Sequence, residues 1–478
     1  MEYQFSKNTF SYLKRAAWEV KNEEQTQEVK LTESMPDIGK ILGVWGQPLI
    51  RSKEWRGSSM SASGGVMVWI LYAPEEGTPQ CVEAWVPFQM QWDFPQTQHD
   101  GTMRFACLLK GIDARSVSAR KMMVRTLLSV AGEALEPTQT EIFQPAELPE
   151  DVQLHKESYA LCLPAESGEK IITLDEEMTP KFTIQKIVHC GLQPEVLDQK
   201  IMADKLVFRG NAKVHVLCLC EEGKLENWEF EIPFSQYAEL EKEYDPHAQS
   251  DIIPTVTNLE LDIQENGELR LKAGLVGQYV IYERPVLELV TDAYSNQREV
   301  TMEQQTLELP AVSAICQETM RIELPLEQGL NPILNATMLA GHPSYGHISG
   351  SFQLLGSDTQ DALCGTNLRW EKEMENATLM ARACVKGKPS VSSGNLQGEI
   401  LLEKQIMMPT AIPMVTSLEM GDTLQKNTDR PSLILRRAEG DSIWDIAKAS
   451  GSTVAAIWEA NGLEGEPKED QMLLIPVL

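Results

Sequence analysis

Two stretches of the sequence decide the fold: Gly64-Gly65-Val66-Met67-Val68-Trp69-Ile70-Leu71-Tyr72 and Gly210-Asn211-Ala212-Lys213-Val214-His215-Val216-Leu217-Cys218-Leu219. Each begins with a glycine, continues as a short apolar run and is closed by Glu-Glu-Gly, at 75–77 and 221–223, which is typical of a turn. The returning stretches 82–86 and 228–232 alternate between apolar and polar residues until a Pro-Phe pair ends them. The pattern predicts two β-hairpins, each with one buried and one solvent-facing side.

The two hairpins belong to a longer internal repeat. After a shift of 146 positions, residues 38–88 match 184–234 at 14 of 51 positions. Unrelated sequences of ordinary composition would match at roughly three. A third, weaker copy of the pattern runs through 347–355 and 367–371. We therefore expect a mainly β protein with two or three tandem β-sandwich-like units.

Helix is scarce outside the two ends of the chain. Apolar residues of Lys7–Val20 recur near helical spacing, which predicts one amphipathic helix. From composition and spacing we expect the following segments: an N-terminal helical segment 1–25, unit 1 at 26–147, unit 2 at 148–300, a degenerate third unit at 301–407, a proline- and glycine-containing linker at 408–431, and a small domain at 432–478.

Composition bounds the setting in which the chain works. Of 478 residues, 42 are Lys or Arg and 70 are Asp or Glu, a net charge of −28 that argues against a nucleic-acid partner. The beginning of the sequence does not resemble a signal peptide, and no apolar run approaches the roughly 20 residues of a membrane helix. Nine scattered cysteines favour a reducing compartment. These features predict a cytoplasmic protein.

The tail from Leu433 to Pro476 reads as strand, helix, helix, strand. Asp441 or Ser442 follows Gly440 and can cap the first helix, Ser452 can cap the second, and Asn461-Gly462 can end it. This order of Gly-Asp-Ser, Ile-Ala, Asn-Gly-Leu and Leu-x-Ile-Pro resembles the LysM domain. The sequence departs from that family at Asp470, where a glycine is usual.

The LysM resemblance implies a βααβ fold and a groove that binds N-acetylglucosamine-containing glycan, chiefly peptidoglycan. The groove would lie between the loops 440–444 and 461–466. Including the neighbouring second helix, the expected groove or partner-binding residues are Gly440, Asp441, Ser442, Ile443, Trp444, Ile457, Trp458, Asn461, Gly462 and Leu463. Trp444 could equally stack on a sugar or fill the core, whereas Trp458 is expected to be exposed, as is typical of a protein-contact anchor.

The repeated unit resembles the SPOCS domains of endospore-forming Firmicutes. The resemblance rests on residues 36–42, Leu71-Tyr72, Val86-Pro87-Phe88, Pro145–Pro149 and Asp292-Ala293-Tyr294-Ser295. SPOCS units followed by LysM are the layout of a clostridial spore-coat morphogenesis protein. That layout implies that the LysM tail docks the coat basement-layer ATPase at the forespore surface in the mother cell, together with other coat proteins.

Catalytic and metal-binding patterns carry little weight in this sequence. Cys218 and Cys220 lie near His215, but their counterparts in the first copy are Tyr72 and Pro74, and a second ligand pair is missing. His342 and His347 are expected in a surface loop. No nucleophile elbow, phosphate-binding loop or zinc-protease motif occurs. We therefore expect no enzyme, no cofactor and no metal.

Two functions remain in the foreground at this point, and a third, a cytosolic hydrolase with an unrecognised site, would need acid and base residues clustered in a pocket. The first is a non-enzymatic scaffold in spore-coat assembly that docks partners through its tail. The alternative is a protein anchored to peptidoglycan through the LysM groove. The tail carries an excess of acidic residues, which gains no attraction from anionic wall polymers and slightly favours a protein partner.

Overall fold

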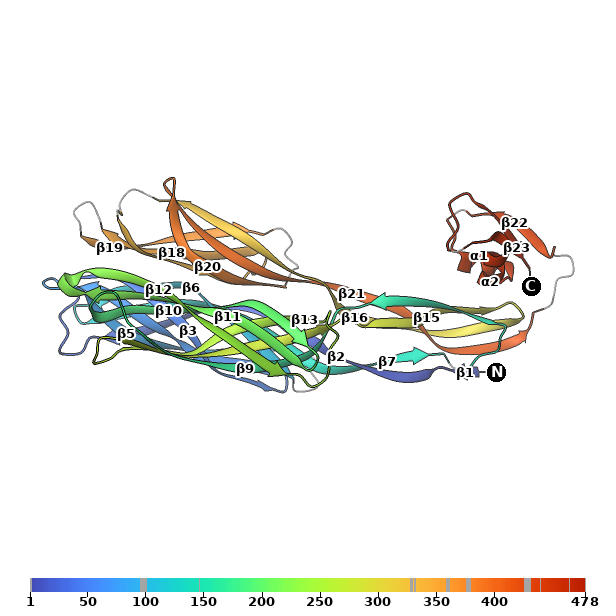
Figure 1. Cartoon of the computed structure of the whole chain (residues 1–478), viewed down its shortest axis with the longest axis horizontal. Coiled ribbons are helices and arrows are strands. Elements are labelled where there is room, and N and C mark those ends of the chain that lie inside the picture. Colours follow the sequence, from blue (N-terminus) through green and yellow to red (C-terminus); the bar gives the residue numbers. More distant parts are fainter. Residues whose placement is uncertain are drawn as a thin grey trace.

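The computed structural model describes residues 2–94, 101–145, 147–326, 330, 332–357, 362–374, 380–424, 431–438, 440–463 and 465–477. Figure 1 shows an elongated molecule in which a broad head of sheets continues into a narrow arm of long strands, and a small domain lies beside the far end of that arm. The N-terminus is at the tip of the arm.

A seven-strand order occurs three times along the chain. The first repeat comprises β1 (Glu2–Gln4), β2 (Ser6–Lys30), β3 (Lys40–Arg56), β4 (Ser59–Ala73), β5 (Gln80–Asp93), β6 (Thr102–Ser118) and β7 (Lys121–Gln144). The second comprises β8 (Val152–Ala160), β9 (Leu163–Met178), β10 (Ile184–Met202), β11 (Lys205–Cys220), the 3-10 turn η1 (Glu221–Gly223), β12 (Leu225–Glu239), β13 (Gln249–Ile263) and β14 (Leu269–Glu283).

The third repeat comprises β15 (Val286–Ser295), β16 (Arg298–Pro325), β17 (Ile333–Ala340), β18 (His347–Ser357), β19 (Leu363–Glu373), β20 (Met380–Ser392) and β21 (Asn395–Thr423). The small C-terminal domain follows, with β22 (Leu433–Arg437), α1 (Ile443–Ser450), α2 (Val454–Asn461) and β23 (Met472–Pro476).

Each repeat folds into two antiparallel sheets. One is the meander β3-β4-β5, β10-β11-β12 or β17-β18-β19, and the other is β2-β7-β6, β9-β14-β13 or β16-β21-β20. In the first repeat the buried faces meet in one core, where Val68 and Ile70 of β4 pack with Phe105 of β6 and Leu128 of β7. The predicted mainly β fold with sandwich-like units is confirmed.

A glycine within each central hairpin strand explains part of the repeat pattern. A Cβ added at Gly64, Gly210 or Gly350 would come within 2.0, 2.1 and 2.0 Å of the backbone oxygens of Leu49, Glu195 and Leu339, respectively. Only glycine lets the paired strand approach this closely. Gly350 therefore marks a third copy of the hairpin in a region with little sequence identity to the other two.

The predicted N-terminal helix is wrong. Residues Ser6–Lys30 form β2, which pairs antiparallel with β7 along nearly its whole length. Burial alternates along Lys21–Lys30, as in a strand with one covered face. The helical spacing of apolar residues in Lys7–Val20 was overridden by this long-range pairing, which a local pattern cannot reveal.

The predicted linker is also wrong over most of its length. Residues 408–423 continue β21 and pair with β16, and only 425–430 lie outside the described residues. Within the described part of the chain, Ile406–Val415 pairs on one side only. Proline is tolerated in such an edge segment, which explains why Pro413 does not break the strand.

The three repeats pack around a common centre. Strand β13 of the second repeat packs on β3 of the first, and β6 of the first packs on β17 of the third. Strand β20 of the third closes the ring against β10 of the second, where Gln193 donates to the Val385 carbonyl and Lys386 pairs with Glu195.

A buried ionic cluster occupies this centre. Each repeat contributes the third residue of its sixth strand to the cluster: Arg104, Asp251 and Arg382. Asp251 lies 3.0 Å from Arg104 Nη2 and 2.5 Å from Arg382 Nη2. Glu133 binds Arg104 and, at 2.6 Å, the Nε of Arg15. All five side chains are almost fully buried, so the charges must compensate one another.

The arm is built from the ends of all three repeats. Strand β1 pairs with β21, and β8 pairs with β15. Apolar side chains from β2, β7, β9, β15, β16 and β21 share one core there, including Tyr12, Leu289 and Leu418. The arm thus carries the C-terminal domain away from the head, as Figure 1 shows.

Candidate functional site

The C-terminal domain is a compact βααβ unit. Strands β22 and β23 pair antiparallel, and the two helices pack on them through Ile443, Ile446, Ile457, Leu473 and Ile475, which are all buried. The predicted βααβ order is confirmed.

Local chemistry sets the helix boundaries of this domain. Ser442 caps α1 by accepting a hydrogen bond from the Asp445 amide, as predicted, and Gly451 ends that helix in the left-handed region. The second helix is capped by Thr453, whose hydroxyl accepts from the Ala456 amide, and not by the expected Ser452. Gly462 ends α2 with a positive φ, as the Asn-Gly pair predicts.

The two loops that would border a glycan groove are tied to each other. The Glu466 carboxylate accepts a hydrogen bond of 2.9 Å from the Ile443 amide at the start of α1. Asp441 pairs with Arg436 of β22. A backbone donor of the expected groove is therefore already used by the protein's own side chain.

Asn461 has a structural role in the domain. Its side-chain amide donates to the Leu474 carbonyl at 2.6 Å and accepts from the Leu474 amide at 2.8 Å, as a neighbouring strand would. This joins the end of α2 to β23. Leu463, which follows Gly462, packs partly buried against the core.

Trp444 lies between the domain and the arm. It is 8% exposed, its ring packs edge-on to Tyr294 and His155, and its indole Nε1 donates 2.8 Å to Asp292 Oδ2. Lys448, one turn later on α1, binds both carboxylate oxygens of Asp292 at 2.7 Å. The Trp444 side chain therefore does not face a free groove, and it packs against the arm as well as against the core of its own domain.

Asp292 and Tyr294 complete this contact from β15. Despite partial burial, the hydrogen bonds from Lys448 and Trp444 lower the pKa of the Asp292 carboxyl. The Tyr294 hydroxyl donates 3.0 Å to the Ser452 carbonyl, between the two helices. The Asp292–Ser295 motif noted in the sequence thus supplies the contact surface on which the C-terminal domain packs, which we call its seat. No local signal in the sequence indicates this role.

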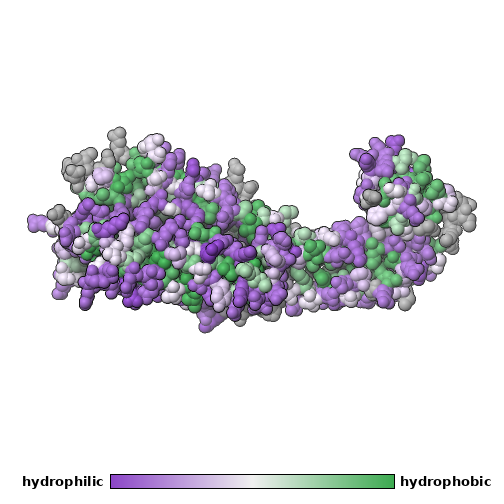
Figure 2. Space-filling view, viewed as in Figure 1, coloured by the Kyte–Doolittle hydropathy of each residue, from purple (hydrophilic) through white to green (hydrophobic). Residues whose placement is uncertain are grey.

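The domain keeps an apolar surface away from this seat. Trp458 is 40% exposed on α2, whereas its neighbour Ile457 is completely buried. On the outer side of the two-stranded sheet, exposed apolar side chains alternate with buried ones and form what we call the outer strand face: Leu433, Leu435, Met472 and Leu474. Figure 2 shows apolar residues on the strand side of this domain.

Comparison with known families identifies two parts of the chain. Residues 183–264, which run from β10 through β13, match the family described as SipL, SPOCS domain. Residues 438–476 match the LysM domain. The chain contains a SPOCS domain and a C-terminal LysM domain. The resemblance to SPOCS and LysM domains seen in the sequence is confirmed. No curated protein and no solved structure matches the chain.

The SPOCS match relates the protein to the spore coat, and both domains are binding or structural domains. Within the described ranges, no three His, Cys, Asp or Glu side chains come together as metal ligands. Cys190 and Cys218 are buried in the core, and burial raises the pKa of each thiol to about 12. No described helix is long and apolar enough to span a membrane.

Proposed function

We propose that this protein is a non-enzymatic scaffold in endospore coat assembly, working in the mother-cell cytoplasm at the forespore surface. The SPOCS and LysM matches support this setting. We further propose that all three repeats are SPOCS units, because β1–β7 and β15–β21 follow the strand order of β8–β14, which contains the matched segment.

The LysM domain, in this proposal, docks a coat morphogenetic ATPase. The observation that carries the proposal is that the expected groove is occupied while apolar residues elsewhere on the domain are free. Trp444 is held by the arm, and Glu466 binds the Ile443 amide in the expected groove. Trp458 and the outer strand face stay exposed. An exposed tryptophan is typical of protein-interface hot spots.

Among the expected site residues, the proposal separates contact from support. Trp458 is the proposed contact residue. Ile457 and Ile443 support it from the core, Ser442 and Gly462 set the helix ends, and Asn461 fixes α2 to β23.

Peptidoglycan binding is the second candidate, because the LysM match covers both groove loops. A glycan in that groove would compete with Glu466 for the Ile443 amide. Gly440, Asp441 and Leu463 would then line the ligand.

A paired binding assay on the full chain tests the proposal. Purified coat ATPase and peptidoglycan sacculi are each titrated with the native protein, Trp458→Ala and, as control, Ile171→Ala, an exposed apolar residue of the head. We expect ATPase binding that weakens at least about tenfold in Trp458→Ala only, as for an interface hot spot. Binding to sacculi alone, competed by chitin oligomers, would contradict it.

A further inference from the structure

A cavity lies at the junction of the three repeats, just beyond the ionic cluster. Strands β6 and β13 line it from three residues past Arg104 and Asp251, with Cys107–Leu109 and Pro254–Val256. Strand β20 lines it just past Arg382, with Cys384, Val385, Gly387, Lys388 and Pro389. Strands β3, β10, β11, β12 and β17 complete the wall, and the cavity measures about 250 Å³. It is therefore a product of the threefold repeat and does not belong to any single unit.

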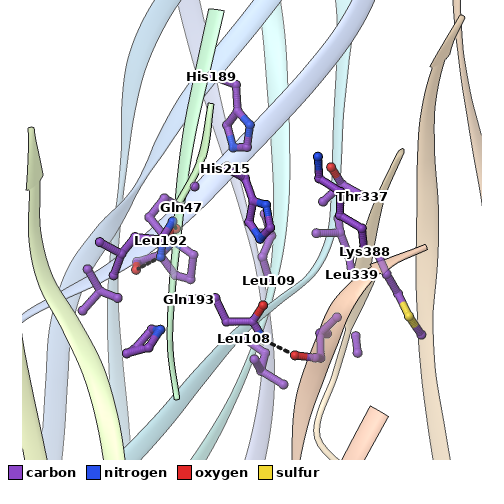
Figure 3. Close-up of a pocket in the computed structure, with 18 of the residues that line it drawn as sticks. Gln47, Leu108, Leu109, His189, Leu192, Gln193, His215, Thr337, Leu339 and Lys388 are labelled. Atoms are coloured by element: carbon purple, nitrogen blue, oxygen red, sulfur yellow. Dashed lines mark hydrogen bonds between the residues drawn. The ribbon is translucent and has the colours of Figure 1, made fainter. Parts of the chain in front are cut away.

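The wall is mostly apolar. Leu108 and Leu109 come from the first repeat, Leu192 and Val216 from the second, and Leu339 from the third. Figure 3 shows these leucines around one space, together with His189, His215, Thr337 and Lys388. A concave apolar site with a few polar groups is the usual form of a small-molecule site.

The polar groups gather where the cavity approaches solvent. The Lys388 side chain is 31% exposed and pairs with Glu229, itself half exposed. His215 Nδ1 lies 3.5 Å from Glu229 Oε1 but has no hydrogen-bond partner among the described residues. An unsatisfied buried nitrogen costs free energy, which a bound acceptor would remove.

The two cavity histidines, His189 and His215, are uncharged at neutral pH, and His189 is fixed by aromatic packing. His189 stacks on Trp45 with 5.7 Å between ring centroids and packs edge-on to Trp69. Burial lowers the pKa of His189 to about 3 and that of His215 to about 4, with the charge of Lys388 adding to both effects. Each neutral ring can donate one hydrogen bond, so this end of the cavity offers donors and one cation.

We propose that this cavity binds a small amphiphilic carboxylate, with its hydrocarbon chain among Leu108, Leu109 and Leu339 and its carboxylate at Lys388 and His215. The lysine ammonium has three donors and can hold Glu229 and the ligand together. The half-exposed Glu229 can also turn to water at little cost. The three repeats would then share one ligand, which couples their relative positions.

Calorimetry on the full chain tests this site with three probes of equal chain length: octanoate, 1-octanol and octylammonium. We expect one octanoate to bind per chain. 1-Octanol should bind with an affinity at least about tenfold lower, because it lacks one charge-assisted hydrogen bond, and octylammonium should not bind. Lys388→Met should lose octanoate affinity by about tenfold or more and keep 1-octanol. Lys386→Met is the matched control, because Lys386 pairs with Glu195 and is not among the cavity-lining residues.

A second variant, Leu109→Trp, fills the cavity and should abolish binding of both ligands in protein that still melts cooperatively. Absence of octanoate binding to the native protein would overturn the proposal. Native-like octanoate affinity in Lys388→Met, or in folded Leu109→Trp, would overturn it equally.

Discussion

The indole Nε1 of Trp444 donates a 2.8 Å hydrogen bond to the carboxylate of Asp292, joining the LysM domain to the arm across 152 positions of sequence. Lys448 binds the same carboxylate, and the Tyr294 ring packs edge-on against the Trp444 ring. The domain is therefore presented in a fixed orientation, with its groove-side tryptophan turned inward and Trp458 outward.

Replacing Trp444 with alanine should free the LysM domain from the arm. The lost hydrogen bond to a charged group is worth about 1.5–3 kcal/mol. We expect amide exchange within β15 and α1 to accelerate by at least about tenfold, measured by hydrogen–deuterium exchange. Trp458→Ala is the control, since Trp458 is partly exposed on α2 and should leave these rates unchanged. Unchanged exchange in Trp444→Ala would show that the contact is not stabilising.

The same contact has a predictable pH dependence. The pKa of Asp292 is lowered in the docked state, so its contribution is complete above the ordinary value of 3.8 and is lost as the pH falls through the lower docked pKa. Docking should thus be constant from pH 8 to about 5. Asp292→Asn should weaken the contact at pH 7 and remove its acid-dependent part.

Removing Asp251 should destabilise the head strongly. Asp251→Ala leaves Arg104 and Arg382 buried without their shared counter-ion, at a cost of about 3–5 kcal/mol. The control is Asp198→Ala, which breaks an exposed pair with Arg209 and should cost less than about 1 kcal/mol. Urea unfolding of both variants checks this, and equal midpoints would contradict the role of the cluster.

Gly210→Ala should distort the pairing of β10 with β11. Its Cβ would lie 2.1 Å from the Glu195 carbonyl oxygen, so the backbone must shift, at a cost of about 1–3 kcal/mol or more. Gly111→Ala is the control, because its Cβ would meet only the Leu127 side chain at 3.8 Å. A thermal melt that ranks the two variants equally would refute this reading of the repeat glycines.

Asp470 stands where the LysM family usually has glycine, and its φ is +65°. That left-handed conformation costs an L-residue about 1–2 kcal/mol, less for aspartate than for most. Asp470→Gly should therefore stabilise the domain by up to about 1 kcal/mol, measured as slower amide exchange in β22 and β23. Asp470→Val should do the opposite.

The sequence predicts those parts of the fold whose signals are local. Period-two alternation and Glu-Glu-Gly locate the hairpins. Ser442 locates the start of the first LysM helix and Asn461-Gly462 the end of the second, whose cap, Thr453, lies one residue past the predicted Ser452. Strand β2 was missed because its state depends on pairing with β7, roughly 90 to 140 positions further along the chain. Gly350 was visible as a signal for the third copy, but its meaning depends on the Leu339 carbonyl that faces it.

In the candidate site, too, only the features set by local sequence could be predicted. Exposure of Trp458 could be predicted from its place beside buried Ile457. The position of Trp444 could not, because Asp292, Tyr294 and His155 reach it only through tertiary folding.

The central claim is that the outward side of the LysM domain binds a protein partner. Hydrogen–deuterium exchange of the full chain, with and without purified coat ATPase, tests it most directly. We predict protection in β22, β23 and around Trp458, with little change at 440–444. Protection confined to 440–444 and 461–466, produced by chitin oligomers and not by the ATPase, would contradict the account and favour a peptidoglycan anchor.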